Sequence, residues 1–417
     1  MAITKPKGTM DVFGAQAANW RYIEAQITKT AALFGLEEIR TPMFENVELF
    51  VRSVGETTDI VQKEMYTFND AGGRTYALRP EGTAPAVRAY LENSLNNMPM
   101  PLKLYYVVHN FRAERPQKGR YREHVQFGTE YFGSYSAAAD AELISVAYTF
   151  LKKVGIENLT LRINSIGDKE CRERYNATLL AFLEEREEGL CELCKSRMKK
   201  NAMRVLDCKN AGCGEIVKKA PVPLDHLGQD AAAHFTELQE ILTDIGVPFT
   251  VDKGIVRGID YYTRTVFEFT STDLGSQSTV CGGGRYDNLI ESHGGAPTGA
   301  VGFGMGIERL LMILEAQGKL PPASQEVMVF VGNMGEAGAK KARQIVYELR
   351  ENGISAVCDL AGRSVKAQMK YADKIGARYA IIIGDSEIES GKIVIKSMAG
   401  GEAGNVDVDG VVQFFVK

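Results

Sequence analysis

Residues 102–133 read LKLYYVVHNFRAERPQKGRYREHVQFGTEYFG, an apolar run, a charged middle and a second apolar run. The outer runs are rich in aromatic and β-branched side chains, which favours two strands of one hairpin. From Phe111 to Glu130 the chain carries four arginines and one lysine against three glutamates. Charged turns are common, so a solvated hairpin with ion pairs is one interpretation, and a site for an anionic ligand is the other.

The segments around this hairpin predict a domain of mixed α+β structure. Trp20, Ile23, Ile27 and Phe34 recur at helical spacing, which predicts a helix over 15–35. Further helices are expected at 140–154 and directly after the glycine-rich residues 302–306. A hairpin is expected over 66–78, with its turn at Asp70–Gly73. Further strands are expected at 37–45 (broken by Pro42), 102–111, 125–133, 255–271, 276–287 and 300–306.

Two changes in composition divide the rest of the chain. Strand signals disappear between residues 170 and 245 while charge rises, so we expect a helical insertion there. The residues PPAS at 321–324 indicate a linker. Beyond them strands and helices alternate, which predicts a small α/β domain with a largely parallel sheet. We therefore expect one domain at 1–325, which contains the insertion at 170–245, and a second at 326–417.

Composition excludes several classes of protein. The chain has 417 residues and a net charge of −4, so any nucleic-acid partner must be met by local basic patches. No apolar run approaches a membrane span, and the first residues, MAITKPKGTMDVFG, lack the apolar core of a signal peptide. We expect a soluble cytoplasmic protein with no membrane partner, whose seven cysteines form no disulfide framework.

The two common glycine-rich nucleotide motifs, G-x-x-x-x-G-K-[ST] and a helix-opening G-x-G-x-x-G, are absent from the sequence. Side chains must then neutralise the phosphates of any nucleotide, and guanidinium groups fit phosphate oxygens bidentately. Arg120 and Arg122 are two residues apart, so on a strand they share a face. Glu114 follows Arg112 by two residues and would accept a hydrogen bond beside a phosphate site.

Three further segments place charged groups next to apolar runs. They are LRPEGTAP with Glu81 and Thr83, VRGIDYYTRTVFEF with Arg257, and GIERLL with Arg309. Each has a structural interpretation, namely a helix cap, core packing of the tyrosines and a surface ion pair. An arginine in a core strand favours a ligand site, because arginine is rarely buried without a partner.

Taken together, these segments resemble the class II aminoacyl-tRNA synthetases, and specifically the histidyl-tRNA synthetases. FRAERPQKGRYRE is similar to motif 2 of the class, GFGMGIERL to motif 3, and TPMFE with Pro42 to the weak motif 1 of the dimer interface. RGIDYYTRTVFE and GGGRYD resemble the two histidine-specific signatures, and RPEGTA resembles a further active-site segment. The resemblance runs from about Gly8 to the C-terminus, where residues 362–384 resemble the anticodon-binding domain.

This resemblance implies the class II synthetase fold, an antiparallel sheet flanked by helices, with a helical insertion and a C-terminal α/β anticodon-binding domain. It also implies a homodimeric enzyme that uses ATP and Mg²⁺ to form histidyl-adenylate and transfers histidine to tRNA(His). Arg257 and Arg112 would be catalytic. For ATP it implies Arg112, Glu114, Arg120, His124 and Arg309. For histidine it implies Glu81, Thr83, Gln126, Glu130, Arg257, Tyr262 and Tyr286.

One position departs from the family pattern. The residue two before Gln126 is commonly phenylalanine, which stacks on adenine, and histidine often follows it, whereas this chain has His124 and Val125. An imidazole also stacks, but it is smaller and titratable. We therefore expect binding of ATP that is weaker, or more sensitive to pH, than the usual pattern gives.

Basic residues predict surfaces for tRNA. Residues 195–219 carry eight lysines and arginines against two acidic residues, which would suit the acceptor arm. Near the C-terminus, basic residues at spacings of three, four and four predict one face of a helix, either solvated or in contact with tRNA. The residues expected to meet tRNA are Arg115 and Gln117 in the hairpin, and Arg363, Lys366, Lys370 and Lys374 in the second domain.

Four cysteines have a spacing typical of structural zinc sites. Cys191 and Cys194 are separated by two residues, and Cys208 and Cys213 by four. The first pair fits a Cys₄ zinc site well and the second pair fits it more loosely. Zinc and reduced thiols in a helical insertion both remain open.

The main alternative function is a non-catalytic relative. Some chains that resemble this catalytic domain are regulatory subunits of the first enzyme of histidine biosynthesis. They typically lose motif residues and the C-terminal domain. This chain keeps Glu81, Arg112, Glu114, Arg257 and Arg309 and has the additional domain, which favours the enzyme.

Overall fold

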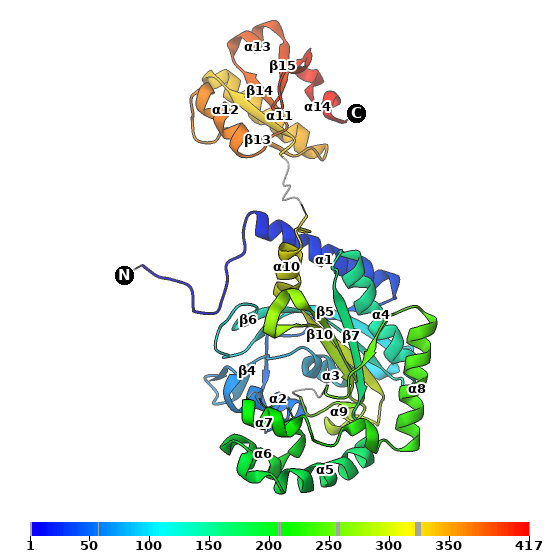
Figure 1. Ribbon diagram of the computed structural model, residues 1–417. Helices are drawn as coiled ribbons and strands as arrows, with labels where there is room; N and C mark the ends of the chain where they lie inside the picture. Colours follow the sequence, from blue (N-terminus) through cyan, green and yellow to red (C-terminus); the bar gives the residue numbers. More distant parts are fainter. Residues whose placement is uncertain are drawn as a thin grey trace. The chain divides into compact units, whose positions relative to one another are not determined.

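The computed structural model describes residues 2–56, 58–206, 208, 210–255, 259–321 and 327–416. The chain divides into two compact units, Met1–Pro321 and Pro322–Lys417, which are considered separately below (Figure 1). Arg257, expected to be catalytic, lies outside the described residues.

The first unit is built on an eight-stranded sheet. The strand order is β1-β5-β6-β11-β10-β9-β7-β8. All central neighbours are antiparallel, and only the edge pairs β1–β5 and β7–β8 are parallel. The predicted α+β sheet is therefore confirmed. Its strands are β1 Glu37–Glu38, β5 Leu102–Phe111, β6 Glu123–Phe132, β7 Leu159–Ser165, β8 Thr250–Val251, β9 Thr263–Ser271, β10 Thr279–Arg285 and β11 Ala300–Gly306.

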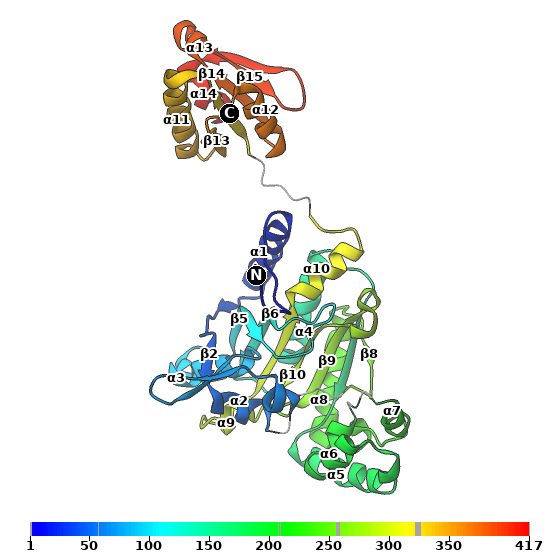
Figure 2. The ribbon, with the colours of Figure 1, turned by 90° about the vertical axis from the view of Figure 1, so that its left-hand side faces the viewer.

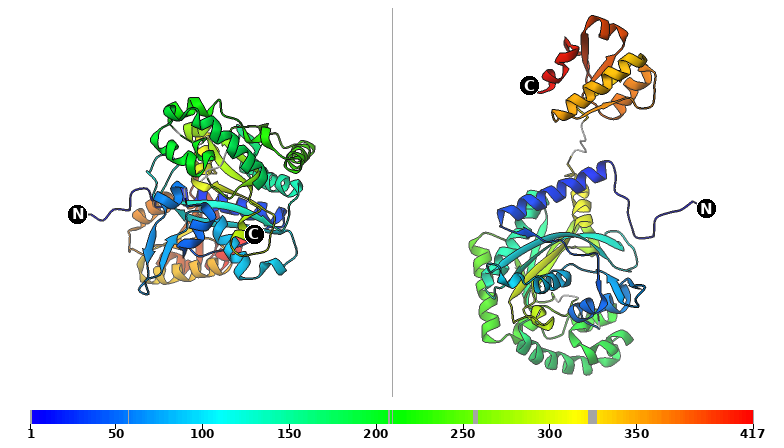
Figure 3. Two further views of the ribbon diagram at one scale, coloured as in Figure 1. Left: turned by 90° about the horizontal axis from the view of Figure 1, so that it is seen from below. Right: turned by 180° about the vertical axis from the view of Figure 1, so that it is seen from behind.

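Alternation along the strands separates two buried faces. Tyr105 and Phe127 belong to the larger core, to which α1, α4, α8 and α10 contribute, whereas Tyr106 belongs to a smaller core with α3 and α9. Figure 3 shows α1 crossing the sheet in the view from behind. These helices are α1 Ala15–Leu33, α3 Thr83–Glu92, α4 Ala137–Lys153, α8 Gln229–Asp244, α9 Leu289–Ser292 and α10 Ile307–Ala316.

A small three-stranded sheet lies beside the main one, with the order β2-β4-β3. The predicted turn after Asn69 joins β3 and β4, and the break at Pro42 separates β1 from β2 into different sheets. Phe44 and Phe68 stay largely exposed, at 50% and 42% of their surface. The elements here are β2 Phe44–Asn46, α2 Val47–Val54, the π-helical turn η1 Ile60–Glu64, β3 Thr67–Asn69, β4 Thr75–Leu78 and η2 Leu95–Asn97.

The predicted helical insertion divides between two cores. Its first part buries residues such as Tyr175, Leu179 and Val205 in a small cluster of its own. Helix α8 instead packs on α4 and buries Phe235 and Leu238 in the main core, so the part with a separate core ends before α8 (Figure 2). The separate part contains α5 Lys169–Glu184, η3 Glu187–Gly189, α6 Glu192–Lys200, η4 Ala202–Val205, α7 Ala211–Val217 and η5 Pro223–His226.

The second unit is an α/β domain around a five-stranded sheet of order β13-β12-β14-β15-β16. The pairs β13–β12 and β12–β14 are parallel, whereas β14–β15 and β15–β16 are antiparallel. The expected largely parallel sheet is therefore found only in its first three strands, and β16 was not predicted. Its elements are β12 Val329–Asn333, α11 Gly335–Glu351, β13 Ala356–Cys358, α12 Val365–Lys374, β14 Tyr379–Ile383, α13 Asp385–Ser390, β15 Lys392–Ser397, β16 Glu402–Asp407, η7 Val408–Gly410 and α14 Val411–Val416.

Candidate functional site

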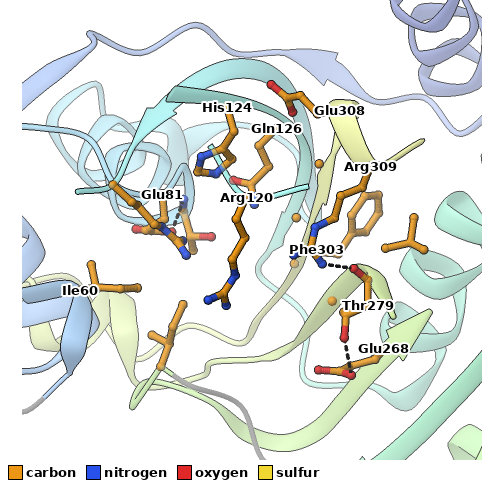
Figure 4. Close-up of a pocket in the computed structure, with 18 of the residues that line it drawn as sticks. Ile60, Glu81, Arg120, His124, Gln126, Glu268, Thr279, Phe303, Glu308 and Arg309 are labelled. Atoms are coloured by element: carbon orange, nitrogen blue, oxygen red, sulfur yellow. Dashed lines mark hydrogen bonds between the residues drawn. The ribbon is translucent and has the colours of Figure 1, made fainter. Parts of the chain in front are cut away.

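A cavity of about 800 Å³ opens on the face of the main sheet that carries Tyr106 (Figure 4). It collects side chains from β6, the β5–β6 hairpin, the start of α3, the segment before β9, and α10. The predicted site residues that line it are Glu81, Thr83, Arg112, Glu114, Arg120, His124, Gln126, Tyr262, Tyr286 and Arg309.

Alternate glycines on β11 leave room for the floor of this cavity. In the β6–β11 pairing, Gly302 lies opposite Glu130 and Gly304 opposite Gly128. A Cβ atom on Gly302 would stand 1.8 Å from Glu130 Oε2, and one on Gly304 would stand 2.0 Å from Gln126 Nε2. The glycines at 302 and 304 therefore give the side chains of β6 their space. The role of this two-residue glycine period was missed from the sequence.

Glu130, a predicted site residue, is fully buried and is not among the residues that line the cavity, but it contacts three that are. Thr83 Oγ1 donates to its Oε1 at 2.7 Å, Tyr106 OH donates to the same oxygen at 2.8 Å, and Tyr286 OH donates to Oε2. Burial raises the pKa of Glu130 to about 8, and the three donating hydroxyls offset only part of that rise. Three hydroxyls of cavity-lining side chains thus hold both oxygens of this carboxyl group.

Glu81 caps the start of α3, which is the structural role that the sequence left open, and it also lines the cavity. Its two oxygens accept the backbone N–H groups of Thr83 and Ala84, each at 2.7 Å, at the start of α3. Burial raises the pKa of this carboxyl group, while those N–H donors lower it. Gln126 is also held in place, because its Oε1 accepts from Asn110 Nδ2 at 2.8 Å.

The other side of the cavity is cationic. Glu114 lies between Arg120 Nη1, at 3.1 Å, and Arg112 Nη1, at 3.9 Å. Arg309 Nε donates to Gly119 O at 3.1 Å and its Nη1 donates to Thr279 O (Figure 4). Burial lowers the pKa of Arg309, although guanidinium stays charged in proteins. Three guanidinium groups thus meet in one cavity, an arrangement suited to a polyphosphate.

His124 lies on β6 beside this cationic side (Figure 4). Burial, followed by the charges of Arg112 and Arg309, lowers its pKa to about 3. The imidazole is therefore neutral between pH 6 and 8. Both desolvation and the nearby cations oppose its protonation, which favours the first of the two expectations, weaker binding of ATP, over binding that is more sensitive to pH.

Several residues of the site were not assigned a role from the sequence. Tyr106, Tyr261 and Glu268 also line the cavity. Tyr106 could have been found from strand alternation, because it pairs with Gly128 and so lies on the sheet face of Gln126 and Glu130. Arg285, next to Tyr286, is fully buried and contacts Asp140 Oδ1 at 2.5 Å and Asp287 Oδ1 at 2.8 Å. This ion pair joins the end of β10 to α4.

The residues expected to meet tRNA are only partly placed as predicted. Arg115 and Gln117 are exposed in the turn between β5 and β6. Lys366, Lys370 and Lys374 share α12 and are exposed. The prediction that Arg363 lies on the same helix is wrong. Helix α12 begins at Val365, and Arg363 Nη1 instead contacts Asp359 Oδ1 at 2.6 Å.

The four insertion cysteines come together in space. Their sulfur atoms all lie within 4.8 Å of one another, and the Cys191 and Cys208 sulfurs are 3.9 Å apart. All four are free thiols, and Cys194 and Cys213 are buried. The longer spacing between Cys208 and Cys213 is accommodated at the start of α7, where Asn210 Oδ1 accepts from Gly212 N at 2.9 Å.

Comparison with known proteins agrees with this geometry. The family profile of histidyl-tRNA synthetase matches residues 8–310, and that of the anticodon binding domain matches residues 326–417. Histidine--tRNA ligase of Acetivibrio thermocellus is 49% identical over 99% of both chains, and that of Clostridium novyi is 51% identical over 98% of this chain and 97% of its own.

A solved structure is similar over the whole chain. The apo histidyl-tRNA synthetase of S. aureus superposes with a TM-score of 0.86 at 36% identity and covers 100% of both chains. Within the described residues, no helix combines the length and apolar character needed to cross a membrane. From its cavity, its profile matches and its full-length relatives, the chain belongs to the histidyl-tRNA synthetase family.

Proposed function

We propose that this chain is a histidine–tRNA ligase, which activates histidine with ATP and transfers it to the 3′ end of tRNA(His). The observation that carries the proposal is one cavity lined by three guanidinium groups and, at its other end, by three hydroxyls that hold the buried Glu130. The alternative, a regulatory subunit without catalysis, makes no use of this combination.

The cationic side would hold ATP. Arg112 would contact the α-phosphate, Arg120 would assist on the phosphates, and Arg309 would meet the γ-phosphate. Glu114 would accept from the adenine amino group, and neutral His124 would stack on the ring. Mg²⁺ would offset the charge of the phosphates, and Glu268 is the cavity carboxylate that would offer it an oxygen ligand of the type it prefers.

The other end would hold histidine. Glu130, Tyr262 and Tyr286 would surround the imidazole, whose N–H group is a partner for the Glu130 carboxyl. A site built around such hydrogen bonds rejects analogues that cannot form them, because its buried groups would stay unpaired. The α-amino group would lie between the oxygens of Glu81, Thr83 and Gln126.

In the first step a carboxylate oxygen of histidine attacks the α-phosphorus. The bond to the bridging oxygen breaks, and pyrophosphate leaves with the electron pair. In the second step a ribose hydroxyl of the tRNA attacks the carbonyl carbon and loses its proton, the bond from that carbon to the phosphate oxygen breaks, and AMP leaves with the electron pair. Since the carboxylate is already ionised at pH 7, positioning and charge stabilisation by Arg112 and Arg257 would carry the first step.

We further propose that tRNA meets Arg115 and Gln117 at the hairpin and Lys366, Lys370 and Lys374 on α12. A cytoplasmic location is part of this proposal, because the proposed substrate tRNA(His) is used in protein synthesis there.

A homodimer is also part of the proposal. Met43 and Phe44 each expose 50% of their surface in the motif 1 segment, and exposed apolar clusters often mark interfaces. Sedimentation equilibrium would test this, since a monomer at micromolar concentration would contradict the proposed dimer.

Histidine-dependent ATP–pyrophosphate exchange tests the catalytic proposal. The chain should catalyse exchange only with histidine, and Arg112→Ala should lower the rate by at least about 100-fold, as loss of a charge-stabilising donor typically does. Arg74→Ala, in an exposed turn, is the matched control. A folded preparation that lacks exchange would favour the regulatory alternative.

A further inference from the structure

The cysteine cluster lies next to a contact between the insertion and the candidate histidine site. The segment Asn201–Arg204, here called the clamp segment, runs between the cysteine pair Cys191/Cys194 and the pair Cys208/Cys213. Any ligand that joins the two pairs therefore closes a loop around the clamp segment.

The clamp segment holds one carboxylate near the cavity. Asn201 Nδ2 donates to Asp260 Oδ1 at 3.1 Å, and Arg204 Nε donates to the same oxygen at 3.0 Å. Asp260 is two residues before Tyr262, which lines the cavity. From α5, Arg172 Nη1 donates to Tyr262 O at 2.9 Å. The insertion thus contacts residues 260–262 through both the Asp260 side chain and the backbone oxygen of Tyr262.

Apolar packing joins the same two regions. Met203, in the clamp segment, packs against the small core of the insertion and also against the core behind the cavity, which contains Tyr262 and Tyr286. A second ion pair, Arg197 Nη2 to Asp59 Oδ2 at 3.0 Å, ties α6 to the segment before η1. The position of the clamp segment is therefore coupled to one wall of the cavity.

The insertion needs a cross-link to hold these contacts firmly. Among the described residues, its separate core contains nine buried apolar side chains, which include Cys194 and Cys213. Cores this small seldom support a rigid fold, and a structural metal is a common remedy.

The geometry of the cluster suits zinc. A tetrahedral zinc ion with Zn–S bonds of about 2.3 Å places its sulfurs roughly 3.8 Å apart. The Cys191 and Cys208 sulfurs are already 3.9 Å apart, and all four lie within 4.8 Å. Backbone N–H groups at Cys191 and Asn210 donate to the sulfurs of Cys213 and Cys208, at 3.2 and 3.4 Å, as second-layer donors do in metal sites. Eight lysines and arginines against two acidic residues at 195–219 would balance a tetrathiolate centre.

We propose that Cys191, Cys194, Cys208 and Cys213 bind one zinc ion, and that this ion fixes the clamp segment so that Arg204 and Asn201 position Asp260 and the adjacent wall of the cavity. Arg204 is a positioning residue that acts through Asp260. The metal and clamp do not depend on the proposed enzymatic activity, but the expected effect on histidine binding rests on it.

Metal analysis of the full chain, purified without chelator, is the first test. We expect about one zinc per chain, lost in Cys208→Ser and Cys213→Ser and kept in the control Cys358→Ser, which changes a cysteine outside the cluster. Less than about a tenth of an equivalent of zinc, or iron in its place, overturns the proposal. If the serine variants do not fold, removal of zinc from the wild-type chain by a chelator, followed by addition of zinc alone, gives the same comparison.

Hydrogen exchange tests the clamp without any substrate. Backbone amides at 259–262 should exchange faster, by about 10-fold or more, after zinc removal and also in Arg204→Ala, which should keep its zinc. Arg204→Lys should restore part of the protection because it keeps a charge for Asp260, and helix α4 is the internal reference. Unchanged exchange at 259–262 in the zinc-free chain overturns the clamp.

The enzymatic readout separates this proposal from the proposed function. Arg204→Ala should raise the KM for histidine several-fold and leave the KM for ATP unchanged, since the clamped wall lies on the histidine side. Equal changes in both constants would overturn the positioning role. If the wild-type chain shows no pyrophosphate exchange, the proposed function fails, while metal content and hydrogen exchange still decide the clamp.

Discussion

At the scale of single residues, the site depends on carboxyl groups placed where water is excluded. Glu130 has no exposed surface, and its two oxygens are held by three hydroxyls. Burial opposes ionisation more strongly than those hydroxyls favour it, so its pKa rises to about 8. The group therefore carries a proton at neutral pH until a polar partner changes its surroundings.

This shift predicts how stability depends on pH. The folded chain keeps a proton on Glu130 up to about pH 8, whereas the unfolded chain loses it near pH 4.5. The folded state thus binds more protons between these values, and the free energy of unfolding should fall as pH rises, by at most about 1.4 kcal/mol per pH unit. In Glu130→Gln this contribution should disappear. Urea unfolding of the first unit at pH 5, 6.5 and 8 would measure the difference.

The exposed Glu24→Gln on α1 is the control for that series, and it should follow the wild type. Identical pH dependence in wild type and Glu130→Gln would contradict the raised pKa of Glu130.

His124 gives a second prediction at this scale. Phenylalanine offers a larger face for adenine, and aromatic stacking adds about 0.5–1.5 kcal/mol, so His124→Phe should lower the KM for ATP by about 2- to 10-fold. Because the imidazole pKa is about 3, the ratio of variant to wild-type KM should stay constant from pH 6 to 8. A ratio that varies with pH would show that His124 titrates in that range.

At the scale of elements, strands and helices decide which side chains meet. The hairpin of β5 and β6 and the charges of its turn were readable from the sequence, because alternation and turn residues are local signals. The role of Gly302 and Gly304 on β11 could not be predicted from the sequence, since it depends on the β6 side chains that lie opposite them. Helix α8 packing into the main core and Arg363 pairing with Asp359 also follow from contacts that one segment alone does not reveal.

The role of Gly302 can be tested directly. In Gly302→Ala the new Cβ would stand 1.8 Å from Glu130 Oε2 and 2.8 Å from the backbone oxygen of Thr129. Of these two neighbours only the Glu130 side chain can move, and the movement would take it away from the three hydroxyls that donate to it. We expect the KM for histidine to rise at least about 10-fold and stability to fall by about 1–3 kcal/mol. Gly214→Ala, where a Cβ meets nothing within 4 Å, is the control.

At the scale of the whole molecule, the two units divide the proposed work. The first holds the cavity proposed for the reaction, and the second offers the exposed lysines of α12. Interactions with phosphate backbones depend strongly on salt because counterions are released. The two units should therefore respond differently to changes of charge.

The variant Lys366→Glu/Lys370→Glu tests this division. It should weaken tRNA binding and reduce the slope of log affinity against log salt by about 1–2, while pyrophosphate exchange stays at the wild-type rate. Lys392→Glu/Lys396→Glu makes the same charge change on β15 and should have a much smaller effect. If both double variants lost tRNA affinity equally, the loss would come from the change in net charge and not from a contact with α12.

The alternation of β5 and β6 has a consequence for how the chain tolerates changes of length. Tyr105 and Phe127 face the main core, while their neighbours Tyr106 and Gln126 face the reaction cavity. Deleting or inserting one residue inside either strand would exchange core and site along the rest of that strand. Natural variation in length should therefore be absent from the two strands, and even in the turn between them it is limited by Arg112, Glu114 and Arg120, which line the cavity.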